Sequence, residues 1–484
     1  MTVRGLGVVR QYREYAVVAL ACLVVLASAG VALGATGRDA NGVTRVATAG
    51  DADAGGDGRR LVAPGVETGI DTDLEAPTDD GVARVGGDRF ETLRAALDAA
   101  DPGDTVRLHG RFDGPVTVET PNVTLTSASP TRAAVVGDGE GTVLTLAAAD
   151  VTVHGVWVRN AGWEASENDA AVWITGHGSS VEDSRVSNTT FGIWVDGATD
   201  VRLVNNTVVG RESVTPLTKR GNGIQLWRAT DAYVAGNRIT DVRDGVYYSW
   251  ASGVVAEDNE MWDIRYGVHY MYSDDCVLRN NTAVDNDVGY ALMLSERLAI
   301  LNNTAVDNDG ESGHGVMVKS IDHSVIRGND LVGNEKGLFV YNSLNNTLSD
   351  NLVLENTVGV HLSAGSVRER VSENSFIHND EPVVADISQQ VAWNGTARGN
   401  YWSGATVADT DDDGVSETRY QPTGLVEQLV STTPSARLFV DSPAFALVRR
   451  AERTVPIVEG PGVVDQHPLA RPPHDEWRRY YAHD

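Results

Sequence analysis

The chain of 484 residues carries 39 Lys and Arg against 67 Asp and Glu, so its formal net charge is −28. Nucleic acids and anionic membrane surfaces both require a basic partner, and this balance argues against both. Low lysine and abundant aspartate are typical of proteins that stay hydrated in concentrated salt, so we expect a halophilic source, with an ordinary acidic secreted protein as the alternative.

The amino-terminal segment is apolar. Residues 16–35 contain no charged residue and follow Arg4, Arg10 and Arg13. Such a stretch spans a hydrocarbon core of roughly 30 Å as a helix, and arginines before it keep the N-terminus in the cytoplasm. A cleaved signal peptide is the alternative, because residues 32–34 resemble a cleavage site. We expect residues 1–36 to form a transmembrane anchor or signal peptide, with the remaining chain outside the cell.

The next segment, residues 37–88, is rich in Gly, Asp, Ala and Thr and poor in large apolar side chains. It shows neither helical nor strand periodicity, so it has too little apolar surface to offset the entropy lost on ordering. We predict a flexible acidic linker.

A short helix is predicted directly after the linker. Residues 90–100 place Phe90, Leu93, Ala96 and Leu97 on one helical face, and the sequence Asp-Pro-Gly at 101–103 ends the helix. An apolar helical face at this point is suited to cover the open first coil of a solenoid.

Two residue types mark a repeat over residues 192–400, because each recurs mostly at intervals of 22. The glycines of a Gly-apolar-x-apolar motif are Gly192, Gly223, Gly245, Gly267, Gly289, Gly315, Gly337 and Gly359. The asparagines are Asn206, Asn237, Asn259, Asn281, Asn303, Asn329, Asn351, Asn374 and Asn400. Short β-type segments with Asn or Gly at the turns are typical of a parallel β-helix. We predict an all-β, right-handed parallel β-helix over residues 89–403, with an amino-terminal capping helix.

Alternation along each strand separates inward from outward side chains. The apolar positions of the Gly motif point inward, and the positions between and after them form two outward columns. The first column is Trp194, Gln225, Tyr247, His269, Ala291, Met317, Phe339 and His361. The second column is Asp196, Trp227, Ser249, Met271, Met293, Lys319, Tyr341 and Ser363.

Three of the five methionines, Met271, Met293 and Met317, lie on this outward face beside His269. Thioether sulfur and imidazole suit Cu(I), and stacked strands bring such groups within one or two rungs of each other. The residues therefore predict a copper site at His269, Met271, Met293 and Met317. From a four-residue insertion, His314 could approach the same face, with a solvated loop histidine as the alternative.

The same face has other interpretations. Methionine also fills adaptable protein interfaces, so a docking surface for a partner or for the chain's own tail is the alternative to copper. We predict Tyr247, Phe339, Tyr341 and His361 as its partner-binding residues. Outward aromatic residues also stack on sugars, although the two columns lack the paired carboxylates of a sugar hydrolase.

Residues 404–484 are predicted to be a carboxy-terminal capping or docking region with a tail. The run from 409 to 417 places Asp409, Asp411 and Asp413 at alternate positions before a glycine, followed by Glu417. Alternating carboxylates and a glycine at the sharp turn are typical of calcium loops, although Glu417 comes earlier than the last ligand of an EF-hand. We predict calcium here, with a solvated acidic turn as the alternative.

Several strings in the chain resemble one known family. They include RYGVHYMYSD at 265–274, VGYALM at 288–293, KGLFVYN at 336–342 and GNYWS at 399–403. Together with the region around 437–444 they look like NosD, the nitrous oxide reductase maturation protein family, over roughly residues 89–473. The anchor, the linker and the tail after residue 473 fall outside the resemblance.

This resemblance implies a non-catalytic accessory protein on the outer side of the cell membrane. The family works with an ABC transporter, made of an ATPase and a membrane subunit, and with a copper chaperone lipoprotein. It helps to assemble the copper-sulfide centre of nitrous oxide reductase in denitrification and is often described as copper binding. The alternative from a different class is a cell-surface carbohydrate-binding or carbohydrate-modifying β-helix protein.

Overall fold

The computed structural model describes residues 61–66, 68–71, 74–363, 365–387, 389–405, 407–422, 426, 429, 433–439, 442–445, 447–448 and 462–481. The predicted anchor within residues 1–36 lies outside this set. Across the described ranges, no helix has the length and apolar character needed to cross a membrane. The described residues up to 426, together with 462–481, belong to one compact unit; those from 429 to 448, including η3 (Pro434–Phe439), belong to another.

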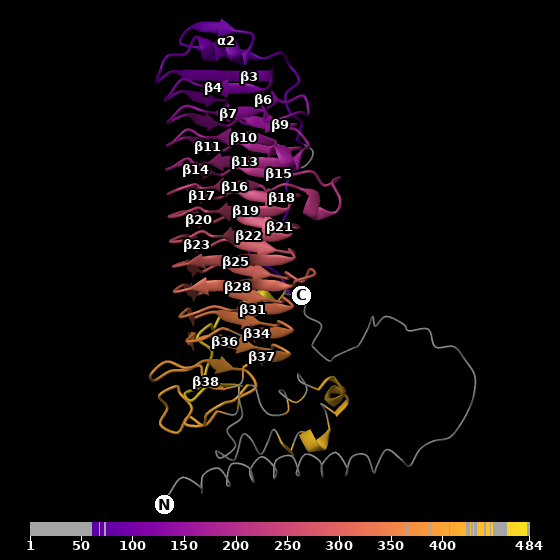
Figure 1. The fold of residues 1–484 in the computed structure, drawn as a ribbon, viewed down its shortest axis with the longest axis vertical. Helices are drawn as coiled ribbons and strands as arrows, with labels where there is room; N and C mark the ends of the chain where they lie inside the picture. The colour runs from indigo at the N-terminus through magenta and orange to yellow at the C-terminus, as the bar shows by residue number, and fades with distance from the viewer. Residues whose placement is uncertain are drawn as a thin grey trace, which may run out of the picture. The chain divides into compact units, whose positions relative to one another are not determined.

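The larger unit is a parallel β-helix, as predicted, in which strands from successive coils lie one above the other (Figure 1). The sheet that contains the Gly motif, called the Gly sheet here, has 12 strands. These are β4 (Val116–Val118), β7 (Leu144–Leu146), β10 (Ala170–Ile174), β13 (Phe191–Asp196), β16 (Ile224–Trp227), β19 (Asp244–Ser249), β22 (Tyr266–Met271), β25 (Val288–Glu296), β28 (His314–Asp322), β31 (Lys336–Tyr341), β34 (Val358–Leu362) and β37 (Glu381–Ala385).

The sheet that follows each marker asparagine is called the Asn sheet. Its strands are β6 (Ala133–Val136), β9 (Trp157–Arg159), β12 (Arg185–Ser187), β15 (Thr207–Val209), β18 (Arg238–Thr240), β21 (Glu260–Trp262), β24 (Thr282–Val284), β27 (Thr304–Val306), β30 (Asp330–Val332), β33 (Leu352–Leu354), β36 (Ser375–Ile377) and β39 (Tyr401–Trp402). The long strand β3 (Thr105–Asp113) pairs with both this sheet and the third one.

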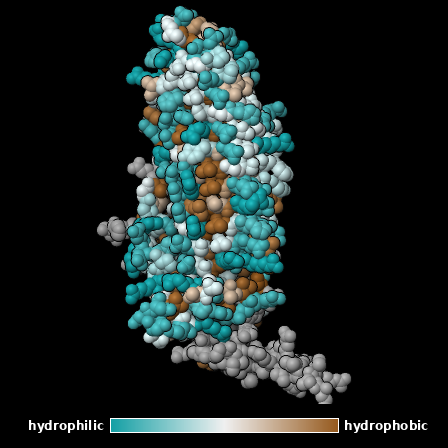
Figure 2. Space-filling model, turned by 90° about the vertical axis from the view of Figure 1, so that its left-hand side faces the viewer, coloured by the Kyte–Doolittle hydropathy of each residue, from teal (hydrophilic) through white to brown (hydrophobic). Residues whose placement is uncertain are grey.

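The third sheet precedes each marker asparagine. Its parallel strands are β5 (Thr124–Thr126), β8 (Thr152–His154), β11 (Ser180–Glu182), β14 (Arg202–Val204), β17 (Tyr233–Ala235), β20 (Val255–Glu257), β23 (Val277–Arg279), β26 (Ala299–Leu301), β29 (Val325–Arg327), β32 (Thr347–Ser349) and β35 (Arg370–Ser372). Figure 2 shows apolar side chains gathered at mid-height on the side of the unit where these strands lie. The outward column there includes Val255, Val277 and Val325, which is 37% exposed.

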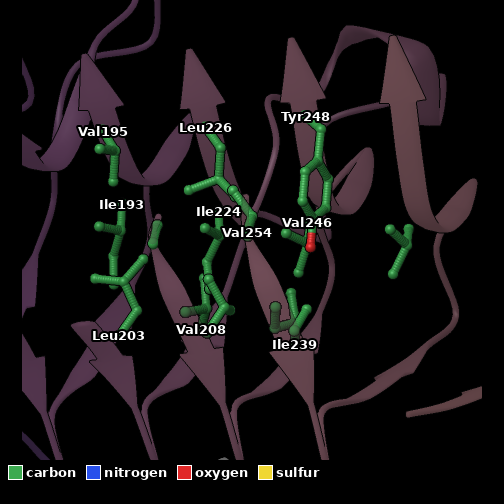
Figure 3. Close-up of a cluster of buried hydrophobic side chains, with 14 of the residues drawn as sticks. Ile193, Val195, Leu203, Val208, Ile224, Leu226, Ile239, Val246, Tyr248 and Val254 are labelled. Carbon is green, nitrogen blue, oxygen red and sulfur yellow. The ribbon is translucent and has the colours of Figure 1, made fainter. Parts of the chain in front are cut away.

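The interior is filled by the inward columns that the alternation predicts. Ile193 and Val195 of β13 stack on Ile224 and Leu226 of β16, and all four are fully buried (Figure 3). β-branched and aliphatic side chains of successive coils therefore stack along the axis and form one continuous core.

The marker asparagines are buried and join the coils. Asn259 donates from its backbone N and its Nδ2 to the Oδ1 of Asn281, at 3.0 and 2.8 Å, and Asn281 repeats the pattern with Asn303. Because each side-chain amide satisfies backbone groups of the preceding coil, asparagine is required at this turn. A second ladder, which the repeat analysis did not single out, consists of Asn286, Asn308, Asn334, Asn356 and Asn379.

The amino-terminal end begins earlier than predicted. β1 (Val82–Val85) is a strand inside the stretch predicted to be linker, β2 (Asp88–Phe90) begins at its last residue, and the helix α2 covers only Leu93–Asp98. Phe90 therefore ends a strand rather than lying on the helix. Leu93, Ala96 and Leu97 are buried as expected, and the Thr92 side chain accepts a hydrogen bond from the backbone N of Ala95 at 3.2 Å.

The linker prediction also needs correction over residues 61–71. Leu61, Val66 and Ile70 pack on the apolar outer column of the Asn sheet, together with η4 (Trp477–Tyr480) and Tyr481. The two chain segments meet where the backbone N of Val62 donates to the carbonyl oxygen of Tyr480 at 2.9 Å. We call this joint cover of the Asn sheet the terminal clasp. The tail therefore lies on the Asn sheet and not on the methionine face.

The remaining elements are short. η1 (Ala165–Glu167) lies between β9 and β10, and η2 (Leu217–Lys219) lies in the first insertion. β38 (Gln390–Ala392) pairs in parallel with β40 (Gly462–Val464) near the carboxy-terminal end. His314, which the sequence placed in the second insertion, is instead the first residue of β28.

Candidate functional site

The Gly sheet brings the predicted copper ligands onto three consecutive strands. Met271 of β22 pairs directly with Met293 of β25, and His269 and Met317 lie on either side of Ala291 in the other column. His269 and Met317 are each 8% exposed, whereas Met271 and Met293 are half-buried. Since adjacent strands are about 4.8 Å apart, the donors occupy three neighbouring rungs. The predicted columns are confirmed.

Asp244 orients the His269 ring. The Nδ1 of His269 lies 3.1 Å from Oδ2 of Asp244, and this contact with a carboxylate assigns the ring proton to Nδ1. Nε2 then keeps its lone pair, and it is buried without a hydrogen-bond partner in the described part of the chain. A histidine that donates one ring N–H to a carboxylate and presents the other nitrogen is the arrangement found at metal sites.

The carboxylate of Asp244 is completely buried and ionised. Arg265 donates to both of its oxygens, from Nε at 2.8 Å and from Nη2 at 2.6 Å. Burial by itself raises the pKa of Asp244, but hydrogen bonds from His269 and Arg265 outweigh burial and hold the pKa below its ordinary value. A permanent negative charge therefore supports the imidazole.

Apolar side chains surround the donors. Ala291, Val288 and Met317 form a buried cluster, against which Met293, Tyr266 and Phe339 pack. Alanine at 291 is the smallest side chain in its column, and it is fully buried between His269 and Met317. Water is excluded from such a surface, and a thioether then competes well for a soft cation.

The predicted partner-binding residues continue this face. Tyr247 packs edge-on against His269, with ring centroids 4.7 Å apart, and Phe339 lies 5.3 Å from His361. Tyr341 is 40% exposed, and Nε2 of His361 lies 3.2 Å from Oδ2 of Asp386. Their role in partner binding stays a prediction.

Apart from His314, sequence reasoning missed the residues that begin the strands of the Gly sheet. Asp244, Tyr266, Val288, His314 and Lys336 occupy one register position in successive strands. This position directly precedes the marker glycine, and Asp244, Val288 and His314 contact outward side chains there. Because these residues precede the marker glycines at regular spacing, the repeat itself could have identified them.

The carboxy-terminal acidic loop is compact. One carboxylate oxygen from each of Asp409, Asp411 and Asp413 lies within 4.8 Å of the others. Glu417 is not in this cluster, because its carboxylate accepts hydrogen bonds from the backbone N and the hydroxyl of Thr410. The calcium prediction for the three aspartates stays a prediction, and the structure does not bring Glu417 into the same group.

The fold and this face define a class: a parallel β-helix protein whose outer surface carries soft metal donors around a carboxylate-supported histidine. Residues 204–406 match the family model described as "Periplasmic copper-binding protein (NosD)". Proteins named "Probable ABC transporter binding protein NosD" are similar over most of the chain. The one from Pseudomonas aeruginosa is 39% identical over 358 residues, covering 71% of this chain and 83% of the relative.

The corresponding protein of Stutzerimonas stutzeri is 35% identical over 384 residues, covering 76% of this chain and 86% of that protein. The chain therefore belongs to the NosD family. Among solved structures, the Family 28 exopolygalacturonase of Yersinia enterocolitica aligns with a TM-score of 0.46 at 11% identity, covering 65% of this chain and 75% of the enzyme. A likeness of this degree carries no argument about activity.

Proposed function

We propose that the chain is a non-catalytic accessory protein on the outer side of the cell membrane that holds Cu(I) for assembly of the copper-sulfide centre of nitrous oxide reductase. It would act with an ABC transporter and a copper chaperone lipoprotein. Membership of the NosD family supports this role, because the relatives are named as probable ABC transporter binding proteins and the family as periplasmic copper-binding. Attachment through residues 1–36 is part of the proposal.

One observation supports the copper-binding part of this proposal. The Nε2 lone pair of His269 is buried and unpartnered within the described residues, and it lies on the same outward face as three thioethers. A buried polar atom without a partner costs free energy, so its retention needs a reason. A soft cation bound by imidazole and thioether supplies that reason.

These donors suit a copper ion that is carried and passed on, rather than a permanently bound cofactor. Thioethers are neutral donors that carry no proton, so Cu(I) bound to them can leave by exchange with the donors of the next protein. Met271 and Met293 are half-buried and therefore reachable by a partner, whereas His269 is held in place by Asp244.

The carbohydrate alternative has less support. In the two outward columns between Trp194 and Ser363, Asp196 is the single carboxylate. Asp386, after β37, contacts His361, and Asp244, directly before Gly245, is already engaged by Arg265 and His269. Acid and base catalysis on sugars requires a pair of available carboxylates, and this face does not offer one.

An anaerobic Cu(I) titration of the full chain against a competing chelator tests the copper part. The double variant Met271→Leu/Met293→Leu keeps the side-chain volume and removes both sulfurs, so it should lose at least tenfold in Cu(I) affinity. Lys319→Ala, next in the same column, is the matched control and should bind as the wild type does. Wild-type protein that fails to compete for Cu(I) would contradict the copper role.

A further inference from the structure

Large apolar side chains line one corner of the solenoid, where the strands of the Gly sheet turn towards the third sheet. They are Trp250, Tyr272 and Leu294, which are 57%, 43% and 41% exposed. Each directly follows a residue of the second outward column, in three consecutive coils. The rings of Trp250 and Tyr272 stack, with centroids 4.6 Å apart. We call these three side chains the corner ridge.

The backbone of the corner ridge is unfavourable for such side chains. Trp250, Tyr272 and Leu294 have φ angles of 56°, 53° and 52°, in the left-handed region. Glycine and asparagine adopt this region readily, whereas a bulky residue there is strained. Two other coils place Gly197 and Asn342 at the same position. Neither backbone preference nor burial explains the ridge, and strain of this kind is retained mainly where it serves a function.

A line of carboxylates follows the corner ridge at the same corner. Asp274, Glu296 and Asp322 occupy one position in three successive coils. Glu296 pairs with Asp322 in register, and its backbone N donates to Oδ1 of Asp274 at 2.9 Å. Within the described residues, Arg297 is the single cation that pairs with this line, and it also pairs with Asp275. Like charges on adjacent rungs repel each other, so this acidic line is incompletely neutralised by the chain itself.

A second set of apolar side chains lies beyond the acidic line, on the third sheet. It is a column of four residues that stack in register and are at least partly exposed: Val255, Val277, Ala299 and Val325. This column lies on the side of the unit that Figure 2 shows. The corner therefore presents an acidic line between two apolar lines. Neighbouring exposed apolar side chains that are bordered by charged groups are typical of interaction sites.

The charge of this corner selects the kind of partner. A second copy of the chain that used the same corner would bring one acidic line against another. Anionic headgroups of a membrane would be repelled in the same way. A protein surface that carries Lys or Arg between apolar side chains would neutralise the acidic line and cover the corner ridge. Trp and Tyr, which form most of the ridge, are the residue types that often contribute most of the binding energy in protein interfaces.

We propose that this corner is a docking surface for a partner protein that carries Lys or Arg between apolar side chains. The inference rests on the partner part of the proposed function and deepens it, because it says where a partner binds. Tyr272 and Leu294 directly follow Met271 and Met293, so a partner docked on the corner ridge is adjacent to those thioethers. Docking itself requires no copper.

The test measures binding of the full chain, without copper, to each purified partner in turn: the detergent-solubilised ABC transporter, the copper chaperone lipoprotein and nitrous oxide reductase. The wild type should bind at least one of them. Trp250→Gly/Tyr272→Asn introduces residue types that other coils use at this position, so it should melt no lower than the wild type. It should nevertheless bind that partner at least tenfold more weakly. Trp163→Ala is the matched control, because Trp163 is also 57% exposed but follows β9.

The acidic line has a test of its own. Glu296→Gln/Asp322→Asn should slow association with the same partner several-fold and weaken its dependence on salt concentration, because steering by opposite charges is lost. Glu381→Gln, at the exposed start of β37, should change neither. Association rates of the double variant that equal those of the wild type at every salt concentration would contradict the charge argument.

The outcomes separate this docking surface from the proposed function. Equal affinity of Trp250→Gly/Tyr272→Asn and the wild type would overturn the docking surface and leave the proposed function intact. A wild type that binds none of the three partners would overturn the docking surface and the partner part of the proposed function, whereas the Cu(I) titration still decides the copper part. Leu294→Asn, a single change in the same ridge, keeps the test valid if the double variant does not fold.

Discussion

At the scale of single residues, Asp244 and Glu369 are two buried carboxylates whose partners have opposite effects on their charge. Asp244 is completely buried, yet contacts with Arg265 and His269 keep it ionised. Glu369 is 8% exposed and has only amide donors from Asn346, so its charge is poorly compensated. The partners of a carboxylate, and not its burial alone, determine whether the charge is retained.

Replacing Asp244 tests its role in positioning His269. Asp244→Asn removes the charged acceptor of Nδ1, so the Cu(I) affinity should fall by about 10- to 100-fold, the range typical of supporting groups behind metal ligands. A chelator-competition titration measures the affinity, and X-ray absorption should show fewer nitrogen ligands on the bound copper. Unchanged affinity and an unchanged ligand ratio in a folded variant would show that Asp244 only stabilises the sheet through Arg265.

Glu369 predicts a pH dependence of stability. Burial raises the pKa of Glu369 from its ordinary 4.5 to about 7. The folded state therefore holds the proton more tightly than the unfolded chain, and the free energy of unfolding should fall as the pH rises through this interval. Glu369→Gln removes the cost, so at pH 8 the variant should be more stable than the wild type by up to about 3 kcal/mol.

Denaturant unfolding at pH 5 and at pH 8 checks this expectation. The gain from Glu369→Gln should shrink towards zero at pH 5, where the folded wild type is already protonated. Glu373→Gln, at a nearby exposed position, should show no such pH-dependent gain. An equal gain for Glu369→Gln at both pH values would contradict the raised pKa.

At the scale of elements, the turns of the β-helix depend on buried amides. Asn281 accepts hydrogen bonds from the backbone N and Nδ2 of Asn259 and donates to the Oδ1 of Asn303 and to the carbonyl of Ala256. Each coil is thereby tied to the coils before and after it. Apolar stacking alone does not provide this link, because it leaves the turn's backbone N–H groups unsatisfied.

Asn281→Ala should destabilise the protein strongly. It leaves the buried backbone N–H of Asn259 without an acceptor and breaks the ladder in the middle, so the free energy of unfolding should drop by about 3 to 5 kcal/mol. Asn280→Ala, at the exposed neighbouring position, should cost about 1 kcal/mol or less apart from the strain of its positive φ. Denaturant unfolding compares the two; equal costs would contradict the role of the ladder.

The acidic loop predicts a response to metal removal. If Asp409, Asp411 and Asp413 bind Ca²⁺, saturating calcium should stabilise the protein, by about 2.7 kcal/mol when calcium is at 100 times its dissociation constant. A chelator should then lower the melting temperature, and Asp411→Asn should abolish the response. Asp412→Asn, in the same loop but outside the cluster, is the control. A melting temperature indifferent to both calcium and chelator would identify the loop as a solvated turn.

At the scale of the whole unit, the terminal clasp protects the Asn sheet. Residues 61–71 and 477–481 meet on the outer apolar column that includes Val306, Val332 and Leu354, all of which are fully or almost fully buried. Asp330, 7% exposed, accepts hydrogen bonds from both Arg479 and Tyr480. The clasp therefore joins segments that lie far apart in the sequence to the carboxy-terminal half of the Asn sheet.

Removal of residues 474–484 should expose this column. The loss of cover by Tyr480, Tyr481 and Trp477 should reduce the free energy of unfolding by several kcal/mol, at about 1.5 to 3 kcal/mol per buried large side chain. Hydrophobic dye binding and limited proteolysis within residues 61–71 should both increase. Glu476→Ala, at an exposed tail position, should change neither. An unaltered melting temperature after truncation would show that the tail does not stabilise the sheet.

The sequence by itself determined the solenoid and its columns, because a 22-residue period combined with strand alternation allows only one set of stacked neighbours. His269, Met271, Met293 and Met317 were therefore assigned to one face correctly. Strand register does not show whether these side chains bind a metal, so their role as ligands stays a proposal.

Other features were decided by the tertiary structure alone. Asp244 and His314 lie directly before a marker glycine, where alternation predicts an inward side chain, yet their contacts with His269 and Phe339 place both on the outward face. Residues 61–71 have a linker's composition, and they become ordered because the Asn sheet and Tyr481 offer apolar surface and a hydrogen-bonded partner. Local composition describes what a segment can do alone, whereas contacts between distant segments decide what it does in the fold.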